Sequence, residues 1–160
     1  DGQIIPDDFV DKLNPYVEFK PVCAELEIGL GVPRDPVRIV STDGALKLIQ
    51  PATGRDLTDR MRGFVSSFLD SIGRVDGFIL KSRSPSCGTR DAKIYSGAEE
   101  DTSIAKGGGF FGGAALRKFP HLAVEDERRL KNLKIRARFL EKLFGCFEPF
   151  KLWESLSKEY

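Results

Sequence analysis

The sequence predicts an α/β domain with an open, mostly parallel sheet flanked by helices, a Rossmann-like three-layer arrangement, and a C-terminal helical extension. Apolar side chains recur at three-and-four spacing over residues 57–72, which indicates an amphipathic helix. The next apolar run, Gly77 to Leu80, does not alternate, which is typical of a central strand covered on both faces. Because a buried strand follows directly on a helix, we expect parallel pairing.

The composition fits one soluble globular domain. Of the 160 residues 41% are hydrophobic and 31% are charged, which favours a folded core over disorder. The net charge of +1 gives no overall signal for a polyanionic partner. No apolar run reaches the roughly 18 residues of a membrane span, and no signal peptide is recognisable, so we expect no membrane partner and a cytoplasmic location. Three scattered cysteines predict reduced thiols or metal ligands.

The first third of the chain predicts one short helix and three strands. Proline and two aspartates open a helix over residues 6–13, since proline and acids suit the first turn. Residues 17–22 read as a strand that runs into Cys23, and the glycines and prolines of 29–36 predict an irregular loop. Residues 38–41 and 45–50 are predicted as strands, joined by a hairpin turn at Asp43-Gly44.

The remaining elements follow from similar patterns. After the helix of 57–72 and the strand of 77–80, we expect a short strand at 93–95, an exposed polar stretch at 96–103, a helix at 110–119 and a strand at 122–124. The triple glycine 107–109 lacks the residues of a phosphate-binding loop and is interpreted as a tight turn. We therefore divide the chain into an α/β domain, 1–125, and a helical extension, 126–160, which could begin a second domain.

The loop Ser84-Pro85-Ser86-Cys87-Gly88 is the strongest candidate for a functional centre. It follows a buried strand, and open α/β sheets place their ligands beyond the carboxyl ends of strands. Nearby Lys81 and Arg83 could lower the pKa of the Cys87 thiol, because positive charge favours a thiolate. The alternative is an ordinary turn with a buried cysteine.

A second thiol, Cys23, ends a predicted strand, so the two cysteines could meet at one sheet edge. Thiolates suit an iron–sulfur cluster or zinc, but two ligands at this spacing are a weak metal signal. Glu25 could exchange protons beside such a site, or it could be a solvated loop acid. His121 is the only histidine, which argues against a zinc hydrolase and against a Cys-His nucleophile.

Four stretches, in this order, resemble the thiouracil desulfidase family: residues 19–25, 27–34, 54–58 and 80–88. The resemblance extends over about 1–125. It implies an enzyme that removes sulfur from a thiolated nucleobase with a [4Fe-4S] cluster held by three cysteines, whose fourth iron takes the sulfur.

The resemblance also implies a role for each site residue. Cys23 and Cys87 match two cluster ligands, and Glu25 matches the catalytic carboxylate. The catalytic hydroxyl belongs to Ser86 or Ser84, of which Ser86 is preferred.

The sequence departs from the family pattern at two places. Ala24 stands where the family has proline between cysteine and glutamate. The chain begins, at Asp1-Gly2, inside a segment that follows the family's first cluster cysteine, and Cys146 does not match that position. We therefore expect an incomplete or labile cluster, or an apo form, for residues 1–160. The extension from Asp126 resembles the junction to a second domain in relatives linked to thiolated tRNA.

The leading hypothesis is thus a desulfidase that acts on a thiolated pyrimidine, as thiouracil or as thiouridine in tRNA. One rival is a non-catalytic module that uses the same cysteines to bind zinc or to sense oxidation. Another is an interaction domain whose thiols are merely buried.

Overall fold

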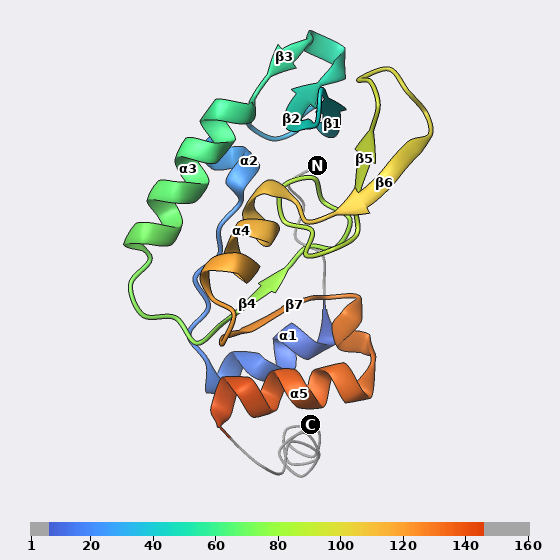
Figure 1. Ribbon diagram of the computed structural model, residues 1–160. Coiled ribbons are helices and arrows are strands. Elements are labelled where there is room, and N and C mark those ends of the chain that lie inside the picture. The colour runs from blue at the N-terminus through green and yellow to red at the C-terminus, as the bar shows by residue number, and fades with distance from the viewer. Residues whose placement is uncertain (1–6, 146–160) are drawn as a thin grey trace.

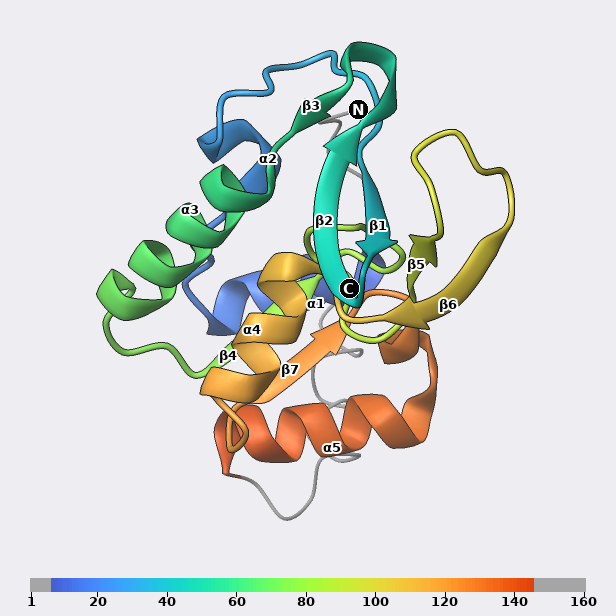
Figure 2. The same ribbon diagram turned by 45° about the horizontal axis from the view of Figure 1, so that its top comes forward.

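The protein is an α/β fold, as the sequence predicts, and the computed structural model describes residues 7–145 (Figure 1). A five-stranded sheet lies at one end and the helices α1 and α5 lie at the other (Figures 1 and 2). Strands β4 and β7 and helix α4 occupy the space between them, and α3 runs along one side. No helix within 7–145 is long and apolar enough to cross a membrane.

The five-stranded sheet is mixed. Its strands, in spatial order, are β3 (Arg55–Asp56), β2 (Ala45–Gln50), β1 (Arg38–Thr42), β5 (Ala92–Tyr95) and β6 (Ser103–Gly107). Strands β1 and β5 are parallel, and the other three pairs are antiparallel. The predicted hairpin between β1 and β2 is confirmed: Asp43 and Gly44 have φ values of 50° and 79°, the left-handed conformation that a two-residue turn requires.

Strands β4 (Gly77–Leu80) and β7 (Ala123–Asp126) form a separate parallel pair. The prediction that Gly77–Leu80 is a central strand is therefore wrong, because β4 pairs with β7 alone in the described part of the chain. Both of its faces are nevertheless covered: Phe78 packs into one apolar cluster and Ile79 into the other. Coverage by helices explains the unbroken apolar run without a wide sheet.

The larger apolar cluster joins α3 (Thr58–Ser71) and α4 (Phe110–Lys118) to both sheets. These helices confirm the two predicted ones to within one residue at each end. Aromatic rings connect the layers, since Phe111 of α4 lies 5.7 Å from Phe68 of α3 and 6.3 Å from Phe78 of β4, measured between ring centroids. The packing fixes α4 against β4, and this matters because α4 also supports the loop described below.

The smaller cluster covers the opposite face of β4 and β7. It combines α1 (Asp8–Leu13) with α5 (Leu133–Phe144), whose Phe9 and Phe139 rings meet edge to face at 6.0 Å. A 3₁₀ turn, Arg129–Lys131, links β7 to α5. Helix is thus present in the predicted extension, although it starts at Leu133; residues 146–160, with Cys146, lie outside the described residues, and the division at 125 remains a prediction.

The strand predicted over residues 17–22 is wrong. A 3₁₀ turn, Asn14–Tyr16, follows α1, and the chain then runs irregularly to a short helix, α2 (Ala24–Glu27). Phe19 and Val22 are partly exposed, and Pro21 has no N–H to offer a neighbouring strand. Conversely, β6 was not predicted because Ile104, its large apolar residue, is 62% exposed on an edge strand.

Candidate functional site

The loop between β4 and β5 is shaped by Ser84. Its hydroxyl accepts hydrogen bonds from the backbone N–H groups of Ser86 (3.1 Å) and Cys87 (3.0 Å). Its carbonyl accepts a further bond from the N–H of Gly88 at 2.8 Å. Ser84 therefore builds the turn that presents Cys87, as serine commonly does in turns.

The first turn of α4 rests directly on this loop. Backbone N–H groups of Phe111 and Gly112 donate to the Ser86 carbonyl at 2.8 and 3.1 Å, so the loop satisfies donors that a helix start leaves unpaired. A Cβ on Gly112 would lie 2.3 Å from the Cys87 carbonyl oxygen, so only glycine permits this approach. The glycines 107–109 do not form the predicted tight turn: Gly107 ends β6 and Gly109 caps α4.

Two acids at the end of β7 hold both ends of the loop. The carboxylate of Glu127 accepts hydrogen bonds from the N–H and the hydroxyl of Ser82, each at 2.7 Å. Asp126, which is fully buried, accepts from the Thr89 hydroxyl at 2.7 Å. The loop that carries Cys87 is therefore fixed from β7 as well as from α4.

Glu127 predicts a pH dependence of stability. Burial would raise the pKa of Glu127, but hydrogen bonds from Lys81 and Ser82 outweigh it and hold this pKa below its usual value. A depressed folded-state pKa stabilises the fold above the unfolded value near 4.5, and this stability is lost as pH falls through the folded-state pKa. We expect Glu127→Gln to lower the melting temperature at neutral pH, and the gap to wild type to narrow in acid. Thermal scans across this range check it against Glu99→Gln, an exposed loop position.

A second group of side chains comes from α2 and the loop after it. Cys23 is the residue that precedes the first turn of α2, and Glu25 lies in that turn. The Glu25 carboxylate accepts from the Ser86 hydroxyl at 2.9 Å and from Arg34 Nε at 2.7 Å. Arg34 Nη2 also reaches Cys23 Sγ at 3.4 Å. The fold thus joins Cys23, Glu25 and the cysteine loop in one connected site.

The two candidate hydroxyls differ in their partners. Ser86 is fully buried and its hydroxyl donates to Glu25, whereas the Ser84 hydroxyl accepts two backbone bonds of the turn. A hydroxyl bonded to a carboxylate can pass or hold a proton. One that accepts from two N–H groups chiefly fixes the backbone.

The electrostatic environment of Cys87 is opposite to the predicted one. Burial, followed by the negative charge of Glu25 and the neighbouring Cys23, raises the pKa of the Cys87 thiol to about 12. Lys81 forms an ion pair with Glu127. The cation that faces the thiols is Arg34, whose own pKa is raised: burial would lower it, but the contacts with Glu25 and Cys23 prevail.

Arg34 is a site residue that sequence reasoning did not identify. It lies in the 27–34 stretch, next to two prolines and two glycines, where an arginine resembles any solvated loop cation. The one feature of the sequence that could have indicated a role for Arg34 was its place in the 27–34 stretch, which resembles the thiouracil desulfidase family. Its side chain is 7% exposed, which no local pattern indicates.

Both described cysteines are free thiols and half-buried. No group of three or more His, Cys, Asp or Glu side chains within residues 7–145 is arranged to hold a metal ion. His121 is exposed between α4 and β7. The described residues therefore offer two soft sulfur donors that adjoin one carboxylate.

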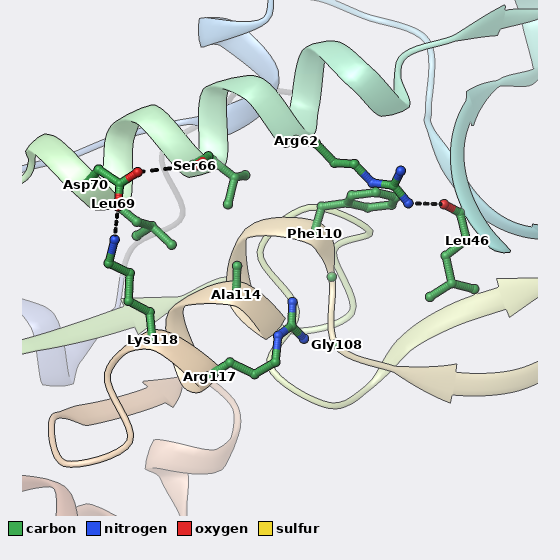
Figure 3. Close-up of a pocket in the computed structure, with 12 residues that line it drawn as sticks. Leu46, Arg62, Ser66, Leu69, Asp70, Gly108, Phe110, Ala114, Arg117 and Lys118 are labelled. Atoms are coloured by element: carbon green, nitrogen blue, oxygen red, sulfur yellow. Dashed lines mark hydrogen bonds and ion pairs between the residues drawn. The ribbon is translucent and has the colours of Figure 1, made fainter.

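A cavity of about 580 Å³ lies between α3, α4 and β2 (Figure 3). Arg62 lies beside the Phe110 ring and donates to the Leu46 carbonyl, while Lys118 pairs with Asp70. Cys23, Glu25 and Cys87 do not line it. Gly109 lines it and also abuts the Ser86 backbone, so the cavity and the site are neighbours across this backbone.

Comparisons of the sequence and of the overall fold with known proteins both lead to one group of enzymes. The family described as 2-thiouracil desulfurase matches residues 1–127. A solved structure, described as the [4Fe-4S]-dependent thiouracil desulfidase TudS, is 28% identical and has a TM-score of 0.57. That similarity covers 84% of this chain and 83% of the other. No curated protein shows a significant match.

Proposed function

The chain belongs to the 2-thiouracil desulfurase family, and we propose from this premise that it replaces the sulfur of a thiolated pyrimidine by oxygen, with a [4Fe-4S] cluster as cofactor. The observation that carries the proposal is the hydrogen-bonded set of Ser86, Glu25, Arg34 and Cys23 beside Cys87. A cysteine with a purely structural role would not need a neighbouring buried carboxylate whose two oxygens are each held by a hydrogen bond.

The two described cysteines are the type of side chain that binds an iron–sulfur cluster. Cys23 and Cys87 are soft thiol ligands, and the remaining ligand is not among the described residues. The Cys87 thiol, half-buried beside the Glu25 carboxylate, holds its proton on its own, and a bound metal ion would supply the positive charge that releases it. When bound, the cluster would supply a Lewis-acidic iron that accepts sulfur.

The reaction is a hydrolysis. Water supplies the oxygen of the product carbonyl, the carbon–sulfur bond breaks, and sulfur leaves with two protons as hydrogen sulfide. Glu25 is the group placed to move these protons, because among the described carboxylates it is the one that adjoins both Cys23 and the Cys87 loop. Ser86 holds one oxygen of Glu25 in place and relays a proton to it.

The substrate is a thiolated pyrimidine, either a free base such as thiouracil or a thiouridine within tRNA, and we place the reaction in the cytoplasm. Support for the base comes from the family, and support for tRNA from the C-terminal extension alone. Parallel assays with thiouracil, thiouridine and thiolated tRNA distinguish these substrates, because the preferred one has the highest kcat/KM.

Serine substitution of each cysteine tests the proposal. Protein expressed from the full coding sequence, reconstituted anaerobically, is expected to show iron–sulfur absorption and to release sulfide from thiouracil. Cys23→Ser and Cys87→Ser should lose both signals, because serine oxygen is a harder and poorer ligand for iron. Cys146→Ser is the matched control and should retain both.

The rival zinc or redox module predicts a different result. Stoichiometric zinc without iron, and no sulfide release from any of the three substrates, would replace the desulfidase proposal. Unchanged absorption in Cys87→Ser would remove this residue from the ligand set.

A further inference from the structure

We propose that Arg34 is a positioning residue that fixes the Glu25 carboxylate and donates a hydrogen bond to the ligand sulfur of Cys23. The inference rests on the proposed function and deepens it.

The guanidinium of Arg34 uses all three of its nitrogens at once. Nε donates to Glu25 Oε2 at 2.7 Å, Nη2 approaches Cys23 Sγ at 3.4 Å, and Nη1 donates to the Gly31 carbonyl at 2.9 Å. The guanidinium is a rigid planar fork, so fixing one contact fixes the direction of the others. The Gly31 carbonyl therefore sets the angle at which Arg34 meets the other two groups.

The loop before Arg34 is built to return the arginine to α2. Gly29 and Gly31 have φ values of 81° and 71°, a conformation that glycine adopts freely. Hydrogen bonds from Gly29 to the Leu26 carbonyl and from Leu30 to the Glu25 carbonyl close the turn on the helix. The chain thus reverses within nine residues and brings Arg34 over Glu25.

The consequence for Glu25 is a fixed orientation. Arg34 holds Oε2 and Ser86 holds Oε1, so the carboxylate cannot rotate without breaking a bond at one end or the other. Both Arg34 and Glu25 are largely buried, at 7% and 16% side-chain exposure, so water replaces neither contact readily. A lysine could satisfy Glu25 or Cys23, but its single ammonium lacks the fork that engages both.

The consequence for Cys23 is electronic. Hydrogen bonds to the sulfurs of an iron–sulfur cluster, and positive charge near it, favour the reduced state and raise its reduction potential. Loss of the Arg34 donor should therefore lower the potential of the loaded protein. A residue that only supported the fold would leave the potential unchanged.

The test compares Arg34→Gln and Arg34→Lys in the reconstituted full-length protein, with Arg62→Gln as control. Arg62 lines the separate cavity and contacts neither cysteine nor Glu25. We expect both Arg34 variants to retain iron, to lose about 10-fold to 100-fold in kcat with little change in KM, and to lower the reduction potential, Arg34→Gln more than Arg34→Lys.

The control should match wild type in kcat, iron content and potential. An unchanged potential and kcat in iron-loaded Arg34→Gln would overturn the inference, as would a kcat loss that merely follows iron content or melting temperature. If wild type loads a cluster but releases no sulfide, the proposed function fails while the shift in potential still tests the contact to Cys23.

Discussion

Glu25→Gln is expected to lower the kcat of desulfidation by about 10²-fold to 10⁴-fold, the usual loss when a general acid–base group is removed. Glutamine keeps the shape of the side chain: its one oxygen can still accept from Arg34, and its amide NH2 can donate to the Ser86 hydroxyl oxygen, so the fold and the cluster content should remain. Glutamine cannot accept a proton and return it, so it cannot transfer protons between the attacking water and the leaving sulfur.

The matched control is Glu27→Gln in the same short helix, where the side chain is exposed. Steady-state sulfide release, iron content and melting temperature are measured for both variants. A kcat within a factor of about three of wild type in Glu25→Gln, or an equal loss in Glu27→Gln, would remove Glu25 from the proton pathway.

The sequence predicted that Cys23 and the Cys87 loop lie close together because each was expected to follow a strand. Only one of these two expectations is correct. Cys87 does follow a buried strand, β4, as its apolar run indicated. Cys23 does not end a strand: it precedes helix α2 at the close of an irregular segment. The apolar pattern of residues 17–22 suggested a strand, but Phe19 and Val22 are partly exposed. The position of Cys23 is set by tertiary packing and not by that local pattern.

Other parts of the site are set by contacts that no local pattern contains. Asp126 and Glu127 bond to Thr89 and Ser82, residues about forty positions earlier in the chain. In the sequence these acids read as the start of a charged extension. Their burial, and that of Arg34, depends on how β7 and α2 pack, which is long-range information.

These hydrogen bonds connect the residues from Asp126 onward to the loop that carries Cys87. Strand β7 ends at Asp126, and the next residue, Glu127, holds Ser82 at the start of the cysteine loop. Helix α5 follows after one 3₁₀ turn and packs against α1 beneath β7. A change in how α5 packs on this face would therefore act on the Cys87 loop through the three hydrogen bonds that Asp126 and Glu127 accept from it.

Gly112→Ala is the substitution expected to disturb the site most without touching a functional side chain. The new Cβ would lie 2.3 Å from the Cys87 carbonyl oxygen and 2.4 Å from that of Gly88, and both are backbone atoms. Overpacking of this kind destabilises a fold by about 1–3 kcal/mol, so α4 and the loop must move apart. We expect a lower melting temperature and, since a displacement of about 1 Å in a site can cost 10²-fold in rate, a large fall in kcat.

Gly63→Ala is the matched control, because Gly63 lies on the exposed side of α3 and a Cβ added there would meet no atom within 4 Å. Alanine should stabilise that helix by about 0.5–1 kcal/mol and leave kcat unchanged. Melting temperatures, iron content and sulfide release measured on both variants separate general helix effects from loop displacement. Wild-type stability and kcat in Gly112→Ala would mean that the close approach of α4 does not hold Cys87 in place, and the position of the thiol would then depend on Ser84 and the two acids at the end of β7 alone.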